Sequence, residues 1–304
     1  MTLAKDESSV RIWRDAIPSL AFKNDALLYS ILYLSALHLA IVQPGNPANM
    51  VAYREYLDLA IRAHTKDLAQ LSKENADVVC LTSTFHRVGA FAILQERQLK
   101  PYYTPPLNWL QMCKGTERVF RATWNWIKND ESSIAIQIIK RPPILPPIWT
   151  GDEPLFGEQN RLEFMHLLRA SSEQSPSEPW DKEVYEAYAS TISYVGSVQK
   201  AIAAGEESSR ICRRLIAFPM LIQQRFIDLV DGAQPRALVV LAHYFSIAAR
   251  FKNIWWLGDT GQREVLGIQS VLPVEWRDLL QWPLKTMHEP QFEINATSIF
   301  TAPP

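Results

Sequence analysis

The sequence has few cysteines and glycines for its length, and it lacks the common catalytic motifs. The three cysteines among 304 residues, Cys80, Cys113 and Cys212, lie far apart, without the paired spacing of a zinc cluster or a redox site. This usage favours a reduced, intracellular setting. A Gly-rich phosphate loop, a nucleophile elbow, a His-Glu-x-x-His helix and an Asp-Asp-x-x-Asp cluster are also missing from the sequence. We therefore expect no metal and no cofactor.

The charges are balanced, with 31 Lys plus Arg against 32 Asp plus Glu. A chain without excess positive charge creates no field that gathers a phosphate backbone, so we expect no direct binding of nucleic acid. Residues 26–42 carry no charged side chain, but Ser30, Ser35 and His38 interrupt them and Pro44 follows. We expect a buried helix there rather than a membrane span, and a cytoplasmic location with the nucleus as the alternative.

Apolar residues recur at helical spacing along most of the chain, and no alternating run is long enough to build a sheet. We predict an all-α fold, an irregular multi-helix bundle. The predicted helices cover about 26–42, 48–71, 76–99, 107–126, 159–170, 180–203, 208–217, 219–231 and 235–251, with shorter ones beyond.

A Pro-rich segment interrupts the helical pattern near the middle. Ile138 to Phe156 contains five prolines and no helical stripe. We expect an extended segment at about 138–158 that joins two helical lobes and could cover the mouth of a pocket. The whole of 1–288 is predicted to be one all-helical ligand-binding domain, followed by a loosely ordered Pro-containing tail at 289–304.

The strongest local signal is an aromatic loop at 253–261. It places Trp255 and Trp256 beside Gly258 and Gly261. Exposed rings in a loop are costly unless they are covered, so two interpretations stay open: the rings plug the core, or they close over an apolar ligand. The glycines would allow positive backbone dihedrals or a close approach to that ligand.

Among the six histidines, His243 is the candidate for a role in catalysis or binding. It lies in the apolar segment VVLAHYFSI, where a hydrogen-bonded core histidine is the alternative interpretation. If a histidine touches a ligand, we expect it to be this one, because it precedes Tyr244 and Phe245 and leads toward the aromatic loop.

Three segments resemble a known family. They are TLAKDESSVRIWRDAIPSLAFKNDALLYSILYLSALHLA at the start, WLQMCKGTERV in the middle, and AQPRALVVLAHYFSIAARFKNIWWLGDTGQREVLGIQSVLPVEWRDLLQWP near the end. Together they are similar to the fungal-specific regulatory domain found C-terminal to the zinc cluster in fungal transcription factors, the group that contains the sterol-uptake regulators. The resemblance implies an all-helical effector domain with a hydrophobic cavity that accepts a sterol, whose occupancy decides between cytosol and nucleus.

Carried over to this sequence, the resemblance puts the aromatic loop at the cavity mouth. The ligand-binding residues expected are Trp255, Trp256, Gly258, Gly261, Phe251, His243, Tyr244, Trp109 and Met112. The sequence as given lacks the closely spaced cysteines and basic linker with which zinc-cluster factors grip DNA. Two explanations stay open: an excised effector domain, or a natural short protein whose cavity has another use.

We therefore expect a module that binds a sterol-like or terpenoid molecule and dimerises through a helix face. The alternative is an enzyme of fungal secondary metabolism that uses the same cavity for a cofactor-free cyclisation or a pericyclic, Diels-Alderase-type step on a terpenoid or polyketide. Its rings would stabilise a polarised transition state, while His243 or a tyrosine supplied a hydrogen bond. A scaffold without a cavity is the third hypothesis.

Overall fold

The computed structural model describes residues 11–99, 101–141, 145–146, 154–169, 178 and 180–292. Every regular element in these ranges is a helix, so the all-α prediction is confirmed. The elements are η1 (Ile12–Ala16), α2 (Ile17–Ala21), α3 (Asp25–Val42), α4 (Pro47–Ala69), α5 (Ala76–Ile93), η2 (Leu94–Glu96), α6 (Leu107–Ile127), α7 (Ile134–Ile139), η3 (Pro154–Phe156), η4 (Glu158–Asn160), η5 (Leu162–Leu168), α8 (Lys182–Ala203), α9 (Ser208–Leu221), α10 (Gln224–Asp231), α11 (Pro235–Ala248), η6 (Ala249–Phe251), α12 (Thr260–Val271), η7 (Val274–Leu280) and α13 (Gln281–Thr286).

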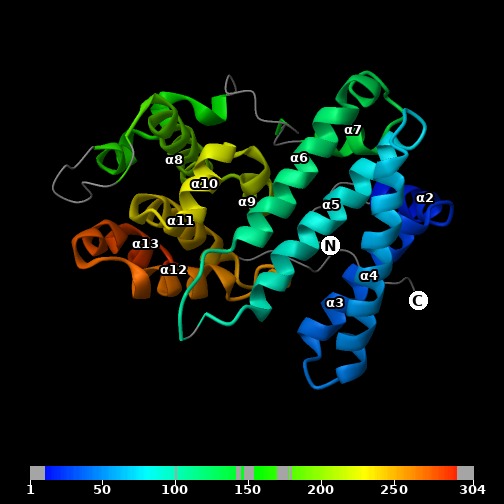
Figure 1. Ribbon diagram of the computed structural model, residues 1–304, viewed down its shortest axis with the longest axis horizontal. Helices are drawn as coiled ribbons and strands as arrows, with labels where there is room; N and C mark the ends of the chain where they lie inside the picture. The colour runs from blue at the N-terminus through cyan, green and yellow to red at the C-terminus, as the bar shows by residue number, and fades with distance from the viewer. Residues whose placement is uncertain are drawn as a thin grey trace.

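The N-terminal half is built on the hairpin of α3 and α4. Asn24 caps α3, its side-chain oxygen accepting a hydrogen bond from the backbone nitrogen of Leu27 at 2.9 Å. Asn46 caps α4 in the same way, and Pro47 occupies its first turn, where no backbone donor is needed. Figure 1 shows α5 beside this hairpin, with α6 next to it at the centre of the molecule.

The C-terminal half surrounds α11. Every side chain of α11 from Arg236 to Ala248 is buried, because α8, α12, α13 and η7 all pack around it. A close contact of this kind is at Gly261 in α12. A Cβ atom at this position would lie 2.4 Å from the backbone nitrogen of Ala249 and 2.6 Å from the carbonyl oxygen of Phe245. The missing side chain therefore lets the two helices meet backbone to backbone.

Helix α6 connects the halves. It packs on α5 in the N-terminal half and on α9 and α10 in the C-terminal half, and Figure 1 shows it lying between the two groups. Its side chains Leu110, Cys113 and Phe120 are buried in the shared core. One hydrophobic cluster consequently runs through both halves.

The Pro-rich segment and the tail are described in part. Ile138 and Ile139 end α7, residues 145–146 have no regular structure, and η3 and η4 occupy 154–156 and 158–160, whereas 142–144 and 147–153 lie outside the described residues. In the tail, Glu289 pairs with Arg250 at 2.8 Å, and the ring of Phe292 stacks on Phe251 at 4.7 Å. Residues 293–304 lie outside the described part, and the proposed domain limits stay a prediction.

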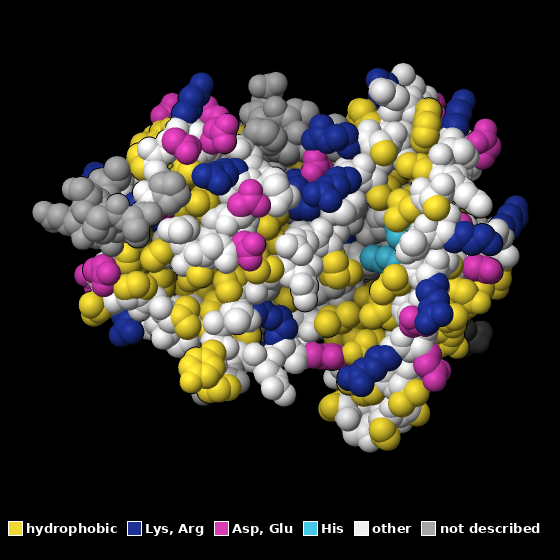
Figure 2. All heavy atoms as spheres, in the orientation of Figure 1, with side chains coloured by type: hydrophobic (Ala, Val, Ile, Leu, Met, Phe, Trp, Pro, Cys, Tyr) yellow, Lys and Arg dark blue, Asp and Glu magenta, His cyan; other side chains and the backbone are white. Residues whose placement is uncertain are grey.

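Two helices are long and apolar enough to cross a membrane by length and composition: Asp25–Val42 and Ala76–Glu96. In the second, 67% of the apolar window is buried, as in the core helix of a globular domain. In the first, only 44% is buried, and the hairpin of α3 and α4 keeps apolar side chains at the surface. Figure 2 shows such side chains among charged ones on this hairpin. The large ones are Leu39, Val42, Val51, Leu59, Ile61 and Leu68.

The contact at Gly261 predicts a difference between two glycine-to-alanine variants. Gly261→Ala should lower the free energy of unfolding by about 3 kcal/mol, because the added methyl meets backbone that cannot move aside. Gly115→Ala in α6 is the matched control: its Cβ meets nothing within 4 Å, so it should raise stability by about 1 kcal/mol. Urea unfolding followed by circular dichroism measures both, and equal effects would refute the packing argument.

Candidate functional site

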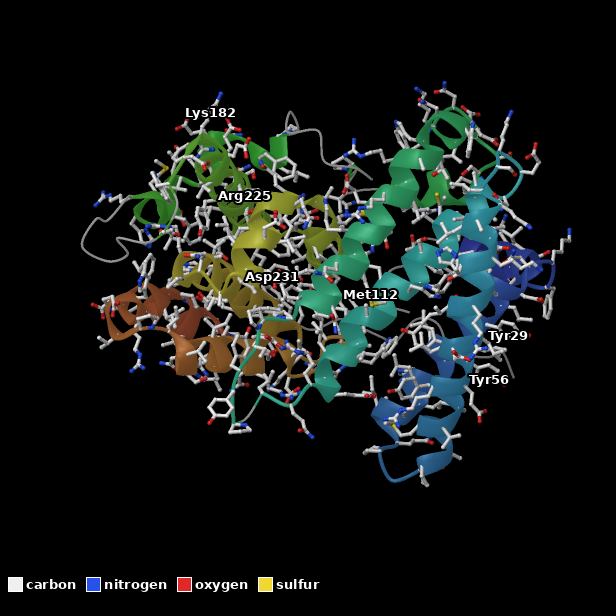
Figure 3. The ribbon with its side chains drawn as sticks, viewed as in Figure 1. Tyr29, Tyr56, Met112, Lys182, Arg225 and Asp231 are labelled. Carbon is white, nitrogen blue, oxygen red and sulfur yellow. The ribbon has the colours of Figure 1, made fainter. Side chains whose placement is uncertain are left out.

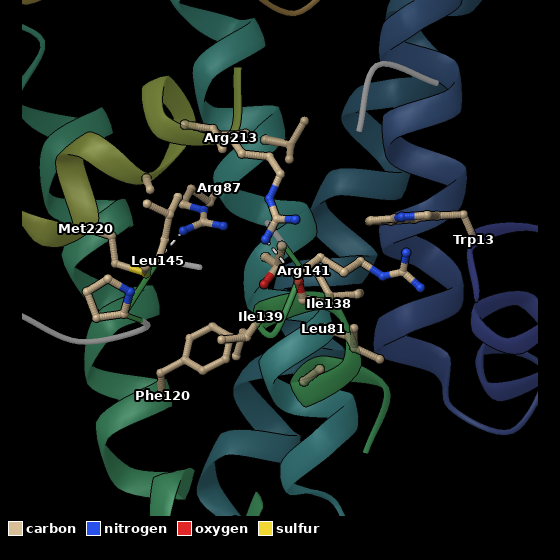
Figure 4. Close-up of a pocket in the computed structure, with 16 residues that line it drawn as sticks. Trp13, Leu81, Arg87, Phe120, Ile138, Ile139, Arg141, Leu145, Arg213 and Met220 are labelled. Carbon is tan, nitrogen blue, oxygen red and sulfur yellow. Dashed lines mark hydrogen bonds between the residues drawn. The ribbon is translucent and has the colours of Figure 1, made fainter. Parts of the chain in front are cut away.

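A cavity of about 100 Å³, partly open to the surface, lies between α5, α6, α7 and α9 (Figure 4). Most of its wall is apolar. The wall includes Trp13, Leu81, Phe120, Ile138, Ile216 and Met220. Leu145 and Pro146 of the Pro-rich segment also line it, so this segment contributes to the wall as well as joining the halves.

Two polar contacts set the positions of the cavity's walls. Asp77 of α5 caps α7: it accepts hydrogen bonds from the Ser133 hydroxyl at 2.5 Å and from the backbone nitrogens of Ile134 and Ala135 at 3.0 and 2.9 Å. Lys114 of α6 donates to the carbonyl oxygens of Met220 and Ile222, at 3.2 and 3.1 Å, and thereby holds the C-terminal end of α9. The first contact places α7 and the second places Met220.

Arg87 is the unusual side chain in this apolar wall. Its Nη1 donates to the thioether sulfur of Met220 at 3.1 Å, and its Nε, which is shielded from solvent, has no hydrogen-bond partner. Among the described residues, no carboxylate forms an ion pair with it. Burial lowers the pKa of Arg87 from its ordinary value, while Cys113 and Tyr194 act in the other direction. Since arginine keeps its charge in proteins, this cation lies in apolar surroundings.

Two further arginines, Arg141 and Arg213, line the same cavity. Arg213 of α9 donates from Nη2 to the Ile138 carbonyl at 3.0 Å, and Figure 4 shows its guanidinium and that of Arg87 pointing into the same part of the cavity. Burial, together with the charges of Arg141, Arg87 and Arg210, lowers the pKa of Arg213 to about 10. The lining contains no Asp or Glu among the described residues. The polar part of this wall is therefore positively charged.

The predicted aromatic residues form packed core at another place. Trp109 is enclosed by Phe91, Tyr244 and Phe245, with ring centroids 5.0, 6.0 and 5.6 Å away. Trp256 meets the other side of Phe91 at 5.2 Å. Tyr244 stacks on Phe218 at 3.9 Å, and its hydroxyl donates to the Leu215 carbonyl at 2.9 Å. These rings fill the space between α5, α6, α9 and α11 themselves.

His243 is a buried neutral imidazole. Its Nδ1 lies 2.8 Å from the Val239 carbonyl, its ring stacks on Trp282 at 5.1 Å, and its Nε2 has no hydrogen-bond partner. Burial lowers the pKa of His243 to about 4, against a small raising effect of the bond to Val239. This geometry fits the alternative interpretation from the sequence, in which His243 is a hydrogen-bonded core histidine. Elsewhere in the described residues, no group of three or more His, Cys, Asp or Glu is placed to hold a metal.

The aromatic loop is held by polar contacts to η2. The side chain of Gln95 donates to the Trp255 carbonyl at 2.9 Å and occupies the space beside Gly258, where a Cβ would lie 2.1 Å from Gln95 Oε1. Gly258 has φ +50°, a value that favours glycine. Trp255 itself meets His38 of α3, with ring centroids 4.9 Å apart. The loop thus joins the C-terminal half to the hairpin.

None of the nine predicted ligand-binding residues lines the cavity described above. Trp109, Tyr244 and Trp256 share one core cluster with Phe251, while Met112 is 44% exposed on α6 (Figure 3). Their contact with a ligand stays a prediction. Sequence reasoning missed Arg87, although a signal existed: it is the one Lys or Arg in the largely apolar segment from Ala76 to Ile93. A lone cation inside a core-type helix needs a local reason.

Residues 7–129 match the family model of the fungal specific transcription factor domain. The resemblance seen in the sequence is thereby confirmed. The match covers η1 to α6 of the described structure, and so includes the helices that supply Leu81, Arg87 and Phe120 to the cavity.

Relatives extend the similarity into the C-terminal half. The chain is 28% identical to a Zn(2)-C6 fungal-type transcription factor of Gibberella zeae, over 93% of this chain and 58% of the relative. It is 29% identical to the Zn(2)-C6 fungal-type transcription factor afumD of Aspergillus fumigatus, over 77% of this chain and 59% of the relative. Sterol uptake control protein 2 of Candida albicans is 23% identical over 88% of this chain and 36% of the relative. The chain thus spans less than two thirds of the length of these relatives.

The environment of His243 predicts that acid weakens the fold. Below its ordinary value of 6.5 the unfolded chain binds a proton that the folded protein does not bind until about pH 4, so stability should fall as the pH drops through this window. The loss from this residue is about 2 kcal/mol between pH 7 and pH 5. His243→Asn keeps a donor for the Val239 carbonyl but does not titrate, so it should reduce the loss.

Urea unfolding at pH 7 and pH 5, followed by circular dichroism, measures this difference. His288→Asn, which changes an exposed histidine, is the control and should leave the loss as in the wild type. An undiminished loss in His243→Asn would show that another group causes the acid sensitivity.

Proposed function

We propose that this chain is an effector-binding regulatory domain that holds a hydrophobic small molecule in the cavity between α5, α6, α7 and α9. The observation that carries the proposal is an apolar cavity, open on one side, whose wall combines side chains from both halves of the molecule. Ligand sites in proteins are concave and mostly apolar, with a few polar groups that orient the ligand. The family match and the transcription-factor relatives support a regulatory use.

The size of the cavity limits what can enter. At about 100 Å³ it is smaller than an engineered cavity of about 150 Å³ that accepts benzene, and smaller than typical drug-sized sites of about 300 Å³ or more. A sterol-like or terpenoid molecule, the class suggested by the names of the sterol uptake control relatives, would place one end inside and extend through the open side. We infer that the cavity selects that end of the ligand.

The enzyme alternative, a cofactor-free cyclisation or pericyclic step in secondary metabolism, stays a prediction. The lining contains hydrogen-bond donors on arginine and on Thr84, but among the described residues it has no side chain that exchanges a proton near neutral pH. The lining therefore favours a site that binds a ligand over a site that catalyses a reaction. A cytoplasmic or nuclear location accords with a regulatory domain of this family.

Filling the cavity should abolish binding. Ala217 is buried and lines the cavity, so Ala217→Phe, or the smaller change Ala217→Met, should occupy the space that the ligand needs. After incubation with a fungal lipid extract, native mass spectrometry should find a retained molecule on the wild type and at least tenfold less on these variants. Ala203→Phe, at an exposed position on α8, is the control. Retention by none of the proteins, or equal retention by all, would overturn the proposal.

Dimerisation through a helix face also stays a prediction. We propose that two copies of the chain associate through the surface of the α3 and α4 hairpin. Ile61 is 45% exposed there, among other apolar side chains. Ile61→Glu should shift the mass measured by light scattering from dimer to monomer. Val274→Glu, at a position 76% exposed in the other half, should leave the mass unchanged. A monomeric wild type at all concentrations would exclude this interface.

A further inference from the structure

We propose that the ligand of this cavity is an anionic amphiphile, whose carboxylate or phosphate head is bound by Arg87 and Arg213 while its apolar tail follows the hydrophobic wall. The inference rests on the proposed function and specifies the chemistry of the bound end. It starts from a mismatch: the cavity is apolar, but its charged groups are all cations among the described lining residues. Apolar walls with one sign of charge concentrate a ligand of opposite charge.

The first argument compares Arg87, which is half-buried, with other buried or half-buried arginines of the same chain. Arg236 pairs with Glu178 at 2.8 Å, and Arg214 pairs with Glu206 at 2.9 Å. Arg97 likewise forms an ion pair with Glu264. Within the described chain, Arg87 has instead a thioether acceptor and a buried Nε without a partner. A half-buried guanidinium with a shielded, unpartnered Nε costs free energy that a bound anion would recover.

The second argument is the direction of the two guanidinium groups. Arg87 reaches the cavity from α5, and Arg213 reaches it from α9 on the opposite side. Figure 4 shows both groups directed at one region, next to Met220 and Ile138. Arg213 donates one of its hydrogens to the Ile138 carbonyl, which fixes the orientation of its planar group. Both guanidinium groups can therefore donate to one oxygen anion placed between them.

The third argument concerns the choice of head group. A guanidinium presents paired donors that match the two oxygens of a carboxylate or two oxygens of a phosphate. The small size of the cavity suits such a head with a short part of its tail, since the volume is about 100 Å³. Phe120, Ile138 and Ile216 provide the apolar surface beside it. A neutral hydrocarbon end would leave the donor groups of Arg87 unsatisfied.

The test uses three ligands with the same tail: dodecanoate, dodecyl phosphate and 1-dodecanol. Isothermal titration calorimetry of the whole chain at pH 7.5 should show at least tenfold tighter binding of one of the anions than of the alcohol. Comparison of the carboxylate with the phosphate identifies the preferred head. Arg87→Met keeps an unbranched side chain of similar reach without the charge. It should reduce the preference for the anion to less than threefold, and binding of the alcohol should persist.

The melting temperature of the ligand-free protein distinguishes a binding role of Arg87 from a structural role. If Arg87 held the fold together, Arg87→Met would lower the melting temperature. We expect a melting temperature equal to or above that of the wild type, because the substitution removes a half-buried guanidinium whose shielded Nε has no hydrogen-bond partner. Arg225→Met is the control, since Arg225 lies on α10 outside the cavity wall, and it should keep the full preference for the anion.

The outcomes are distinguishable. Equal affinity of the wild type for dodecanol and both anions would overturn the anionic head but leave the proposed function standing. Retention of the preference in Arg87→Met, or a clear drop in its melting temperature, would also overturn this inference. If the wild type binds none of the three ligands and retains nothing from a lipid extract, the proposed function fails together with it.

Discussion

The burial of α11 on all sides is the constraint on which the rest of the structure depends. A helix whose side chains from Arg236 to Ala248 are all shielded needs neighbours in every direction, and α8, α12, α13 and η7 supply them. Arg236 satisfies its charge inside this shell through Glu178 and the Leu167 carbonyl, and its guanidinium lies 4.6 Å from the ring of Trp180. Gly261 permits the close approach of α12 to Phe245 and Ala249. The C-terminal half is consequently filled by its own side chains.

The cavity lies where the C-terminal half meets the N-terminal half. Helices α5 and α7 bring one part of its wall and α9 brings the other, so a molecule bound there would touch both groups of helices. A ligand can shift an equilibrium between two arrangements only by binding them with different affinity. Contact with both halves is the physical condition for such a difference, and α5 and α6 of this wall lie within the residues that match the fungal specific transcription factor domain.

Sequence reasoning predicted the helical part of the fold well and the site incompletely. Periodicity placed α4, α8 and α11 within a few residues of their observed ends, and Asn46, Pro47 and Pro235 mark the starts of α4 and α11 locally. It extended α5 to about residue 99, beyond its observed end at Ile93. It also singled out the aromatic loop and His243, but periodicity does not tell a ring that lines a cavity from a ring that fills a core. In the structure Trp109 and Trp256 both pack against Phe91, and Trp256 is distant from the other two in sequence.

The sequence by itself determined the helices, their caps, the near-neutral charge and the likeness to the regulatory domains, because each of these depends on residues close together in the chain or on composition. Only the tertiary structure decided where space was left over and which side chains surround it. Arg87 and Arg213 are far apart in sequence, and they share one cavity because α5 and α9 pack across α6. Whether a buried arginine meets a carboxylate is settled by such long-range packing, and no local pattern contains that information.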